Sequence, residues 1–181
     1  MSALTLLTDL YRYMGWADAL MLTTVMENPE AAKDELVLAK LRHLHATQRI
    51  FLDVWNDRPI DPKAADKLDL PALAVFAREV HDSAMQFLTS QTSKTLQTPV
   101  KLPWSKTASE KLGFEVAEHT LADTLVQVSS HSCYHRGQIS ARLRELGIDP
   151  PMIDYIAWTW RHKPEASWPG GDQGEKLGKA E

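Results

Sequence analysis

Two histidines four residues apart, His131 and His135, are the strongest chemical signal in the sequence. On an α-helix, residues i and i+4 lie on one face with Cβ atoms about 5–6 Å apart. Two imidazoles in that arrangement can bind one metal ion at about 2.0–2.1 Å each. The neighbouring Val128 and Ile139 indicate a partly buried helix, where two histidines with no shared purpose would be costly. The competing interpretation is two separately hydrogen-bonded histidines, and the spacing alone does not decide between them.

A third ligand must come from another helix, and His43 and His45 are the candidates. Two residues apart on a helix, they point about 200° from each other, so only one can face a shared site. On a helical wheel, His45 shares its side with two arginines, which predicts a solvated edge. His43 shares its side with Ile50 and Val54, which predicts a drier edge, and this small difference favours His43.

The other candidate groups are interpreted as structural. His81, His119 and His162 are expected to be core or surface residues without a chemical role. Cys133 should point away from the histidine pair and is interpreted as a small buried hydrophobe. The residue after the first histidine of the pair is serine rather than glutamate, which excludes the HExxH arrangement of zinc proteases.

Four long segments with the apolar periodicity of amphipathic helices would position these side chains. They span about residues 4–26, 34–56, 69–91 and 121–146, and a short fifth helix is expected at 152–161. Thr120 with Asp123 three residues on predicts a capped start of the fourth segment. Residues 92–119 contain two prolines and several β-formers, so they are expected to form a long connection with a short hairpin. The pattern predicts an all-α fold.

The division of the chain follows from its composition. One domain is expected over residues 1–164, and a disordered tail over residues 165–181, which are rich in Gly, Pro, Lys and Glu. The tail carries four acidic and two basic residues, so half of the formal charge of −4 belongs to it. The remaining part is close to neutral, which argues against a nucleic-acid partner bound by bulk electrostatics.

Composition also narrows the compartment. The single cysteine excludes a disulfide framework and fits a reducing environment. No uncharged apolar run approaches the roughly 18–20 residues that a membrane span needs. The first 16 residues lack the basic start of a signal peptide. We therefore expect a soluble, cytoplasmic protein with no membrane partner.

Three segments carry the pattern of a known family. Residues 13–18 read Tyr-Met-Gly-Trp-Ala-Asp, and residues 42–51 place a histidine before a small residue and an aromatic. Residues 131–138 read HSCYHRGQ and are followed by Asp154-Tyr155. In these segments, and over about residues 4–160, the sequence resembles the DinB/YfiT-like family of small bacterial four-helix-bundle metalloproteins.

The resemblance implies an up-down-down-up four-helix bundle, here with a short extra C-terminal helix, and frequent homodimers. It implies that His43, His131 and His135 bind a divalent metal, commonly zinc or nickel, because His43 rather than His45 matches the family position. Some relatives are thiol-dependent transferases or isomerases that use a low-molecular-weight thiol as a cofactor.

Three histidine ligands would leave a coordination position open, which is typical of a catalytic metal site. Gln138 lies on the same helix face and is the candidate catalytic residue, either donating to a metal-bound oxygen or orienting a ligand; the competing interpretation is that it only packs between helices. Trp16 and Trp158 are candidates to line a cofactor pocket, and the competing interpretation is that they belong to the core of the bundle. Arg136 points away from the pair and is expected to form an ion pair with Asp154. The glycine that follows it, Gly137, suggests the close approach of another helix.

Two function classes follow. The leading hypothesis is a metal-dependent enzyme acting on a small molecule, a thiol S-transferase, isomerase or hydrolase that activates a thiol or water. The alternative is a non-catalytic metal-binding stress-response or interaction protein. A helical bundle without metal, in which the histidines meet by chance, is a third interpretation.

Overall fold

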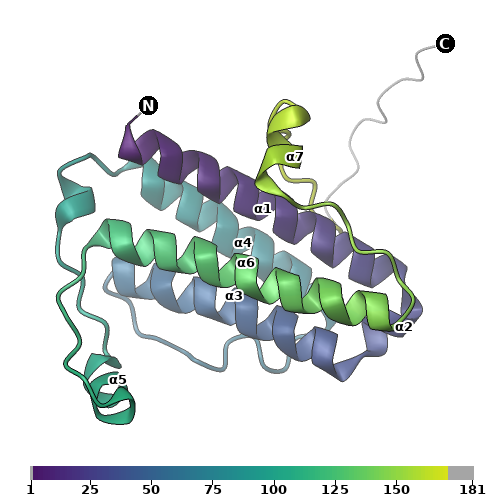
Figure 1. The fold of residues 1–181 in the computed structure, drawn as a ribbon, viewed down its shortest axis with the longest axis horizontal. Helices are drawn as coiled ribbons and strands as arrows, with labels where there is room; N and C mark the ends of the chain where they lie inside the picture. The colour runs from purple at the N-terminus through teal and green to yellow at the C-terminus, as the bar shows by residue number, and fades with distance from the viewer. Residues whose placement is uncertain (1, 171–181) are drawn as a thin grey trace.

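The computed structural model describes residues 2–170, and its framework is four long helices packed side by side (Figure 1). Helix α1 contacts α4 and α6, and helix α3 likewise contacts α4 and α6. No β-strand occurs in residues 2–170, so the predicted all-α class is confirmed. The long helices are α1 (Ala3–Glu27), α3 (Glu35–Trp55), α4 (Leu70–Thr89) and α6 (Leu121–Glu145).

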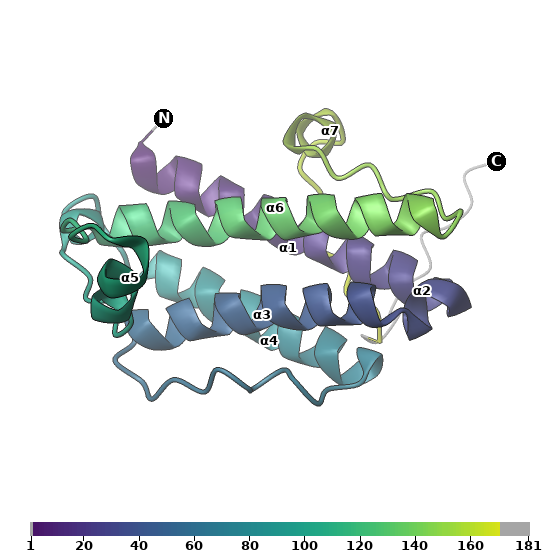
Figure 2. The same ribbon diagram turned by 60° about the horizontal axis from the view of Figure 1, so that its bottom comes forward.

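The long helices run in two directions, as Figure 2 shows. Helices α1 and α6 run one way, and α3 and α4 run the other way. Residues 56–69 pass back along the length of α3 before α4 begins, which lets these two consecutive helices point in the same direction. As a result α3 and α6, which carry the candidate histidines, are antiparallel neighbours.

The helix ends follow side chains that satisfy free backbone groups. Asp34, Asp69 and Thr120 each accept a hydrogen bond from the backbone amide three residues on. Asp123 also accepts from the Thr120 amide, which completes the capping box that the sequence predicts at the start of α6. Gly147 directly follows Leu146, the C-cap residue of α6. It has a φ of 75°, a left-handed conformation that suits glycine.

The interior contains two large apolar clusters with polar side chains between them, and a smaller aromatic cluster. One cluster gathers Leu7, Tyr11 and Met14 of α1 with the first turns of α6. The other gathers Met21 and Leu22 of α1 with the last turns of α6. Five buried polar residues lie between these two groups, and we call them the polar layer: Asp18, His45, Gln48, Ser132 and Arg136.

The hairpin expected between the third and fourth long helices is wrong, while the predicted end of the first helix and the presence of a short last helix are confirmed. Residues 92–119 form a short 3₁₀ turn, η1 (Thr95–Gln97), and a helix, α5 (Ser105–Leu112), with one isolated bridge from Pro99 to Thr120 in place of a hairpin. Chain after Asn28 starts a new helix, α2 (Pro29–Lys33), because proline is well tolerated in a first turn. The last helix, α7 (Tyr155–Trp160), is shorter than the expected 152–161.

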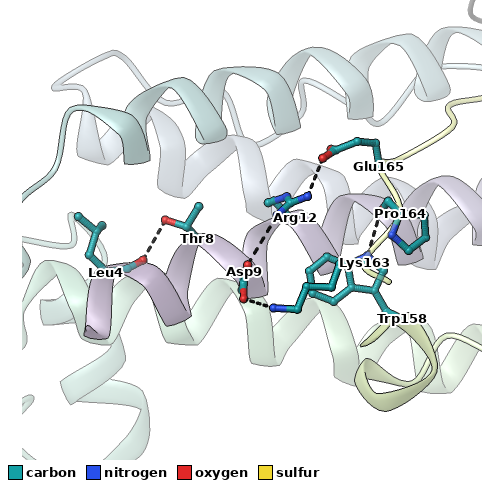
Figure 3. Close-up of polar contacts among 8 residues, drawn as sticks. All are labelled: Leu4, Thr8, Asp9, Arg12, Trp158, Lys163, Pro164 and Glu165. Carbon is teal, nitrogen blue, oxygen red and sulfur yellow. Dashed lines mark hydrogen bonds and ion pairs between the residues drawn. The ribbon is translucent and has the colours of Figure 1, made fainter. Parts of the chain in front are cut away.

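The first residues of the segment expected to be a disordered tail, which was predicted to begin at residue 165, pack against the helices. Residues 161–168, which we call the strap, lie along α1 (Figure 3). Lys163 forms an ion pair with Asp9, and Glu165 accepts a hydrogen bond from Arg12 at 2.6 Å. Trp168 packs against the apolar cluster at the end of α1, because an exposed indole would cost more than a docked one. The rest of the predicted tail, residues 171–181, lies outside the described residues.

Candidate metal site

Three imidazoles converge on the groove between α3 and α6. His43 comes from α3, and His131 and His135 come from successive turns of α6. The Nε2 atoms of His43 and His131 are 3.2 Å apart, and one ring nitrogen from each of the three residues lies within 4.8 Å of the others. The structure thus brings together the three histidines that the sequence singled out.

The antiparallel packing of α3 and α6 creates this convergence. An ion pair between Asp34 and Arg142, at 2.8 Å, ties the start of α3 to the end of α6. Two and a half turns further along α3, that register sets His43 opposite His131 and His135. The i, i+4 spacing on α6 then supplies two ligand groups from one helix face.

The distances fit a shared metal ion. Two nitrogen ligands at about 2.0–2.1 Å from a tetrahedral ion would be about 3.3 Å apart. The 3.2 Å between the Nε2 atoms of His43 and His131 agrees with that value. The three rings are tilted against each other by 61–78° rather than stacked, so their nitrogens can point to a common centre. In the part of the chain that the structure describes, no carboxylate or thiol joins the cluster.

The protonation of the cluster also suits metal binding. Burial, followed by the neighbouring His135 and His43, lowers the pKa of His131 to about 4. Burial likewise lowers the pKa of His135. Both rings are therefore neutral at pH 7, and a neutral imidazole carries the lone pair that a metal needs.

Gln138 fixes the tautomer of one ligand. Its Oε1 can only accept, so the Nδ1–H of His135 donates to it across 2.9 Å. The lone pair of His135 is then on Nε2. Of the two roles that the sequence left open for Gln138, this contact corresponds to orienting a ligand.

The site opens to solvent on one side. His43 is exposed, His131 is half-buried and His135 is buried. Tyr134 stands at the rim, 64% exposed, with its ring centroid 5.2 Å from that of His135. The exposed His43 therefore marks the side of the cluster that faces solvent.

A comparison with protein families decides where this site belongs. The family model that matches the sequence is that of the DinB family, and it covers residues 1–167. The chain belongs to the DinB family. Among curated proteins, none matches this DinB-family chain. No helix within residues 2–170 is long and apolar enough to cross a membrane.

The exposed and buried sides of α3 are the reverse of those predicted from the helical wheel that favoured His43. His45, placed on a solvated edge, is 1% exposed, whereas His43, placed on a drier edge, is exposed. The prediction assumed that Arg42 and Arg49 extend into solvent, but both side chains form hydrogen bonds or ion pairs with other parts of the protein. Arg42 donates to the Leu68 carbonyl and Arg49 pairs with Asp53.

The two tryptophans proposed for a cofactor pocket lie elsewhere in this DinB-family protein. Trp16 and Trp158 are both buried in an aromatic cluster with Tyr13. The Trp158 indole N–H donates a hydrogen bond to the Pro164 carbonyl at 2.9 Å. The structure therefore does not bring either side chain to the three histidines.

The remaining candidates also stay apart from the cluster. His81 is half-buried against Trp168, with its Nδ1 lacking a partner among the described residues. His119 bonds its ring to the Ala117 carbonyl at 3.3 Å, and His162 is exposed. Cys133 is exposed rather than buried, so its interpretation as a buried hydrophobe is wrong.

Sequence reasoning missed the polar layer behind the site. Arg136 does not pair with Asp154, as expected, but with Asp18 of α1 at 2.7 Å, and both side chains are almost completely buried. Gly137 has nothing within 4 Å of where a Cβ would lie, so the expected close helix approach is also wrong. The one available signal was Asp18 itself, an acidic residue on the otherwise apolar stripe of α1.

Proposed function

We propose that this DinB-family protein binds one divalent metal ion through His43, His131 and His135. The observation that carries the proposal is the convergence of three imidazole nitrogens within 4.8 Å, without a fourth protein ligand among residues 2–170. Imidazole ligands suit zinc and nickel, which are therefore the metals we propose. The 3.2 Å nitrogen separation and the lowered pKa of His131 support the fit.

We further propose that the metal-loaded protein is an enzyme. A bound divalent ion with an open position would supply Lewis acidity, lowering the pKa of a water or a small thiol there. The chain's own residues hold three positions around the ion, and Gln138 keeps His135 in the ligating tautomer. The exposed side of the groove, with Tyr134 at its rim, would admit a small-molecule substrate. This supports a thiol S-transferase-like, isomerase or hydrolase activity rather than a metal store, which would need no open face.

Family membership supports two structural proposals as well. The directions of the four long helices match an up-down-down-up four-helix bundle of the DinB type. We also propose that the protein forms a homodimer, as the resemblance implies, which sedimentation in the presence of metal would test.

Metal analysis tests the first step. Protein purified with limiting zinc or nickel should carry about one ion per chain. His43→Ala, His131→Ala and His135→Ala should each lower that content strongly, whereas His119→Ala, outside the cluster, should not. Unchanged metal content in all three cluster variants would refute the site.

Turnover tests the second step. The metal-loaded protein is incubated with a panel of low-molecular-weight thiols and electrophiles, and conjugate formation is followed by mass spectrometry. Acceleration should vanish after chelation and in His131→Ala. Stoichiometric metal without acceleration of any tested reaction would leave the metal site standing but reject the enzyme proposal in favour of a non-catalytic role.

A further inference from the structure

The polar layer lies directly behind the candidate metal site. On α1 and α6 the residues of the polar layer fall between those of the two large apolar clusters. These helices therefore carry a band of polar side chains between two apolar bands. The polar band lies at the level of the three histidines, because Ser132 and Arg136 each follow a ligand histidine directly in sequence. Buried polar groups are costly unless they are paired, so this arrangement calls for a purpose other than packing.

Gln48 of α3 connects the layer. Its Nε2 donates to Asp18 Oδ2 of α1 at 2.7 Å and to Ser132 Oγ of α6 at 3.1 Å. Its Oε1 accepts from the Nδ1–H of His45 at 3.1 Å. One amide thus joins the two ligand-bearing helices to each other and to α1.

Asp18 closes the connection from a helix that offers no ligand. Its Oδ1 accepts from Arg136 Nη1 at 2.7 Å, while its Oδ2 accepts from Gln48. The two carboxylate oxygens therefore hold α6 and α3 at once. Hydrogen bonds to charged groups in a dry interior are strong and directional, so they set both the spacing and the rotation of those helices.

The layer and the ligands occupy different faces of the same helix turns. His43 and His45 point in nearly opposite directions, outward to the site and inward to the layer. On α6, Ser132 and Arg136 are rotated about 100° from His131 and His135. Any rotation of α3 or α6 that moved a ligand nitrogen would also break a bond in the layer.

We propose that Gln48, held by Asp18, is a positioning residue for the metal site and fixes α3 against α6 so that His43 meets His131 and His135. The inference rests on the proposed metal-binding function. It assigns the layer a role in metal affinity that is separate from its contribution to folding. Loss of supporting contacts around metal ligands typically weakens metal binding about 10–100-fold.

The chain offers a matched pair of variants for the test. Gln48→Met removes the bridging amide with little change in volume. Thr124→Val removes a part-buried hydrogen bond between the same two helices, from Trp55 Nε1 to Thr124 Oγ1 at 3.0 Å, at the opposite end from Asp34 and Arg142. Zinc affinity is measured by chelator competition and the unfolding midpoint by thermal melting. Gln48→Met should weaken zinc binding about 10–100-fold, while Thr124→Val should lower the melting temperature without weakening zinc binding.

A second arm needs no metal. The single, exposed Cys133 on α6 and a cysteine introduced by Ala39→Cys at an exposed site on α3 accept spin labels. The distance distribution between the labels, measured by double electron–electron resonance, should broaden or shift in metal-free Gln48→Met and stay as in wild type in Thr124→Val.

The outcomes separate the two proposals. A wild-type protein without zinc would refute the proposed function, and the label distances would then decide the positioning role alone. Zinc-binding wild type with unchanged affinity in Gln48→Met would overturn the positioning role, as would equal losses in Gln48→Met and Thr124→Val. If Gln48→Met does not fold, Ser132→Ala removes the contact from Gln48 to α6, together with a hydrogen bond inside α6 to the Val128 carbonyl, and is read by the same criteria.

Discussion

Two groups of histidine-containing polar residues face away from each other across α3 and α6. In the outer group, the Nε2 atoms of His43 and His131 face each other at 3.2 Å, and no other protein group among residues 2–170 bonds to either. In the inner group, His45 sits two residues away and donates to Gln48, which in turn bonds to Asp18. In the inner group each polar atom of the Gln48 amide has a partner, although His45 Nε2 and Arg136 Nε and Nη2 have none among residues 2–170, whereas the outer nitrogens point toward one another.

The difference separates a structural polar cluster from a candidate binding site. A buried network is tolerated when its donors and acceptors match, as those of Gln48 do. Two neutral imidazole nitrogens that face one another can share at most one hydrogen bond, whereas a cation between them can bind the lone pairs of both. Several ring nitrogens that converge near solvent are thus a better indicator of a metal site than a histidine alone, since His45 is also a buried histidine.

The largest expected effect concerns the inner group. Asp18→Asn removes the negative charge that pairs with buried Arg136, and breaking a buried pair costs about 3–5 kcal/mol of unfolding free energy. Urea denaturation of the metal-free protein measures it. Asp82→Asn, in the exposed pair with Arg78, is the control and should cost less than about 1 kcal/mol. Similar costs for the two variants would mean that the inner group is no more important than a surface pair.

The next effect concerns the outer group. Gln138→Leu leaves the Nδ1 of His135 without its acceptor, so the ligating tautomer is no longer favoured. Zinc affinity should fall about 10–100-fold, with little change in metal-free stability. Competition with a chromophoric chelator measures the affinity. Gln127→Leu, at an exposed position on the same helix, should bind zinc as wild type does; equal weakening by both variants would remove the special role of Gln138.

Both groups should respond to pH in the metal-free protein. Burial lowers the pKa of His45 in the inner group, and of His131 and His135 in the outer one, from the ordinary value of about 6.5. Between the two pKa values the unfolded chain binds protons that the folded protein does not bind. The free energy of unfolding therefore decreases as the pH falls below about 6.5. For His131, with a pKa of about 4, the loss continues to about pH 4.

Thermal melting between pH 7.5 and 5 should show this loss. We expect a fall of at least about 2–4 °C, the change that about 1 kcal/mol makes in a domain of this size. Comparing wild type with His45→Gln and with His131→Gln cancels the carboxylates common to all three and shows which group contributes more. A pH dependence that neither variant reduces would contradict the assignment to these histidines.

The smallest expected effect lies between the groups on α6. Gly137 follows Arg136 of the inner group and precedes Gln138, and a Cβ there would meet nothing within 4 Å. Gly137→Ala should therefore stabilise the protein by about 0.5–1 kcal/mol through helix propensity. Gly15→Ala should do the opposite, since its Cβ would lie 2.2 Å from the His81 ring. Destabilisation by Gly137→Ala in a urea titration would show that this turn of α6 needs glycine for the positions of its neighbours.

The sequence predicted those parts of the molecule that local rules determine. The spacing of His131 and His135 placed two rings on one helix face, and Thr120 with Asp123 marked the start of that helix. Bringing His43 to them depends on how α3 packs against α6, which spacing within one helix cannot predict. The family resemblance implied His43 correctly, whereas the helical wheel favoured His43 for a wrong reason, because it exchanged the exposed and buried sides of α3.

The errors have a common physical cause. The partner of Arg136 lies more than a hundred residues away in sequence, on a helix that only the tertiary fold brings alongside. Arg42 and Arg49 resembled solvent markers until the structure gave them partners. Trp168 resembled part of a polar tail until an apolar surface was available to cover. Long-range pairing, rather than local preference, determines each of these positions.

The strap across α1 also has a consequence for how the protein is made. Asp9 and Arg12 meet Lys163 and Glu165 over separations of 154 and 153 residues (Figure 3). A ribosome adds about 5–20 residues per second, so the first helix waits roughly 10–30 s for these partners. The contacts between α1 and the strap therefore form only after the four long helices have been synthesised.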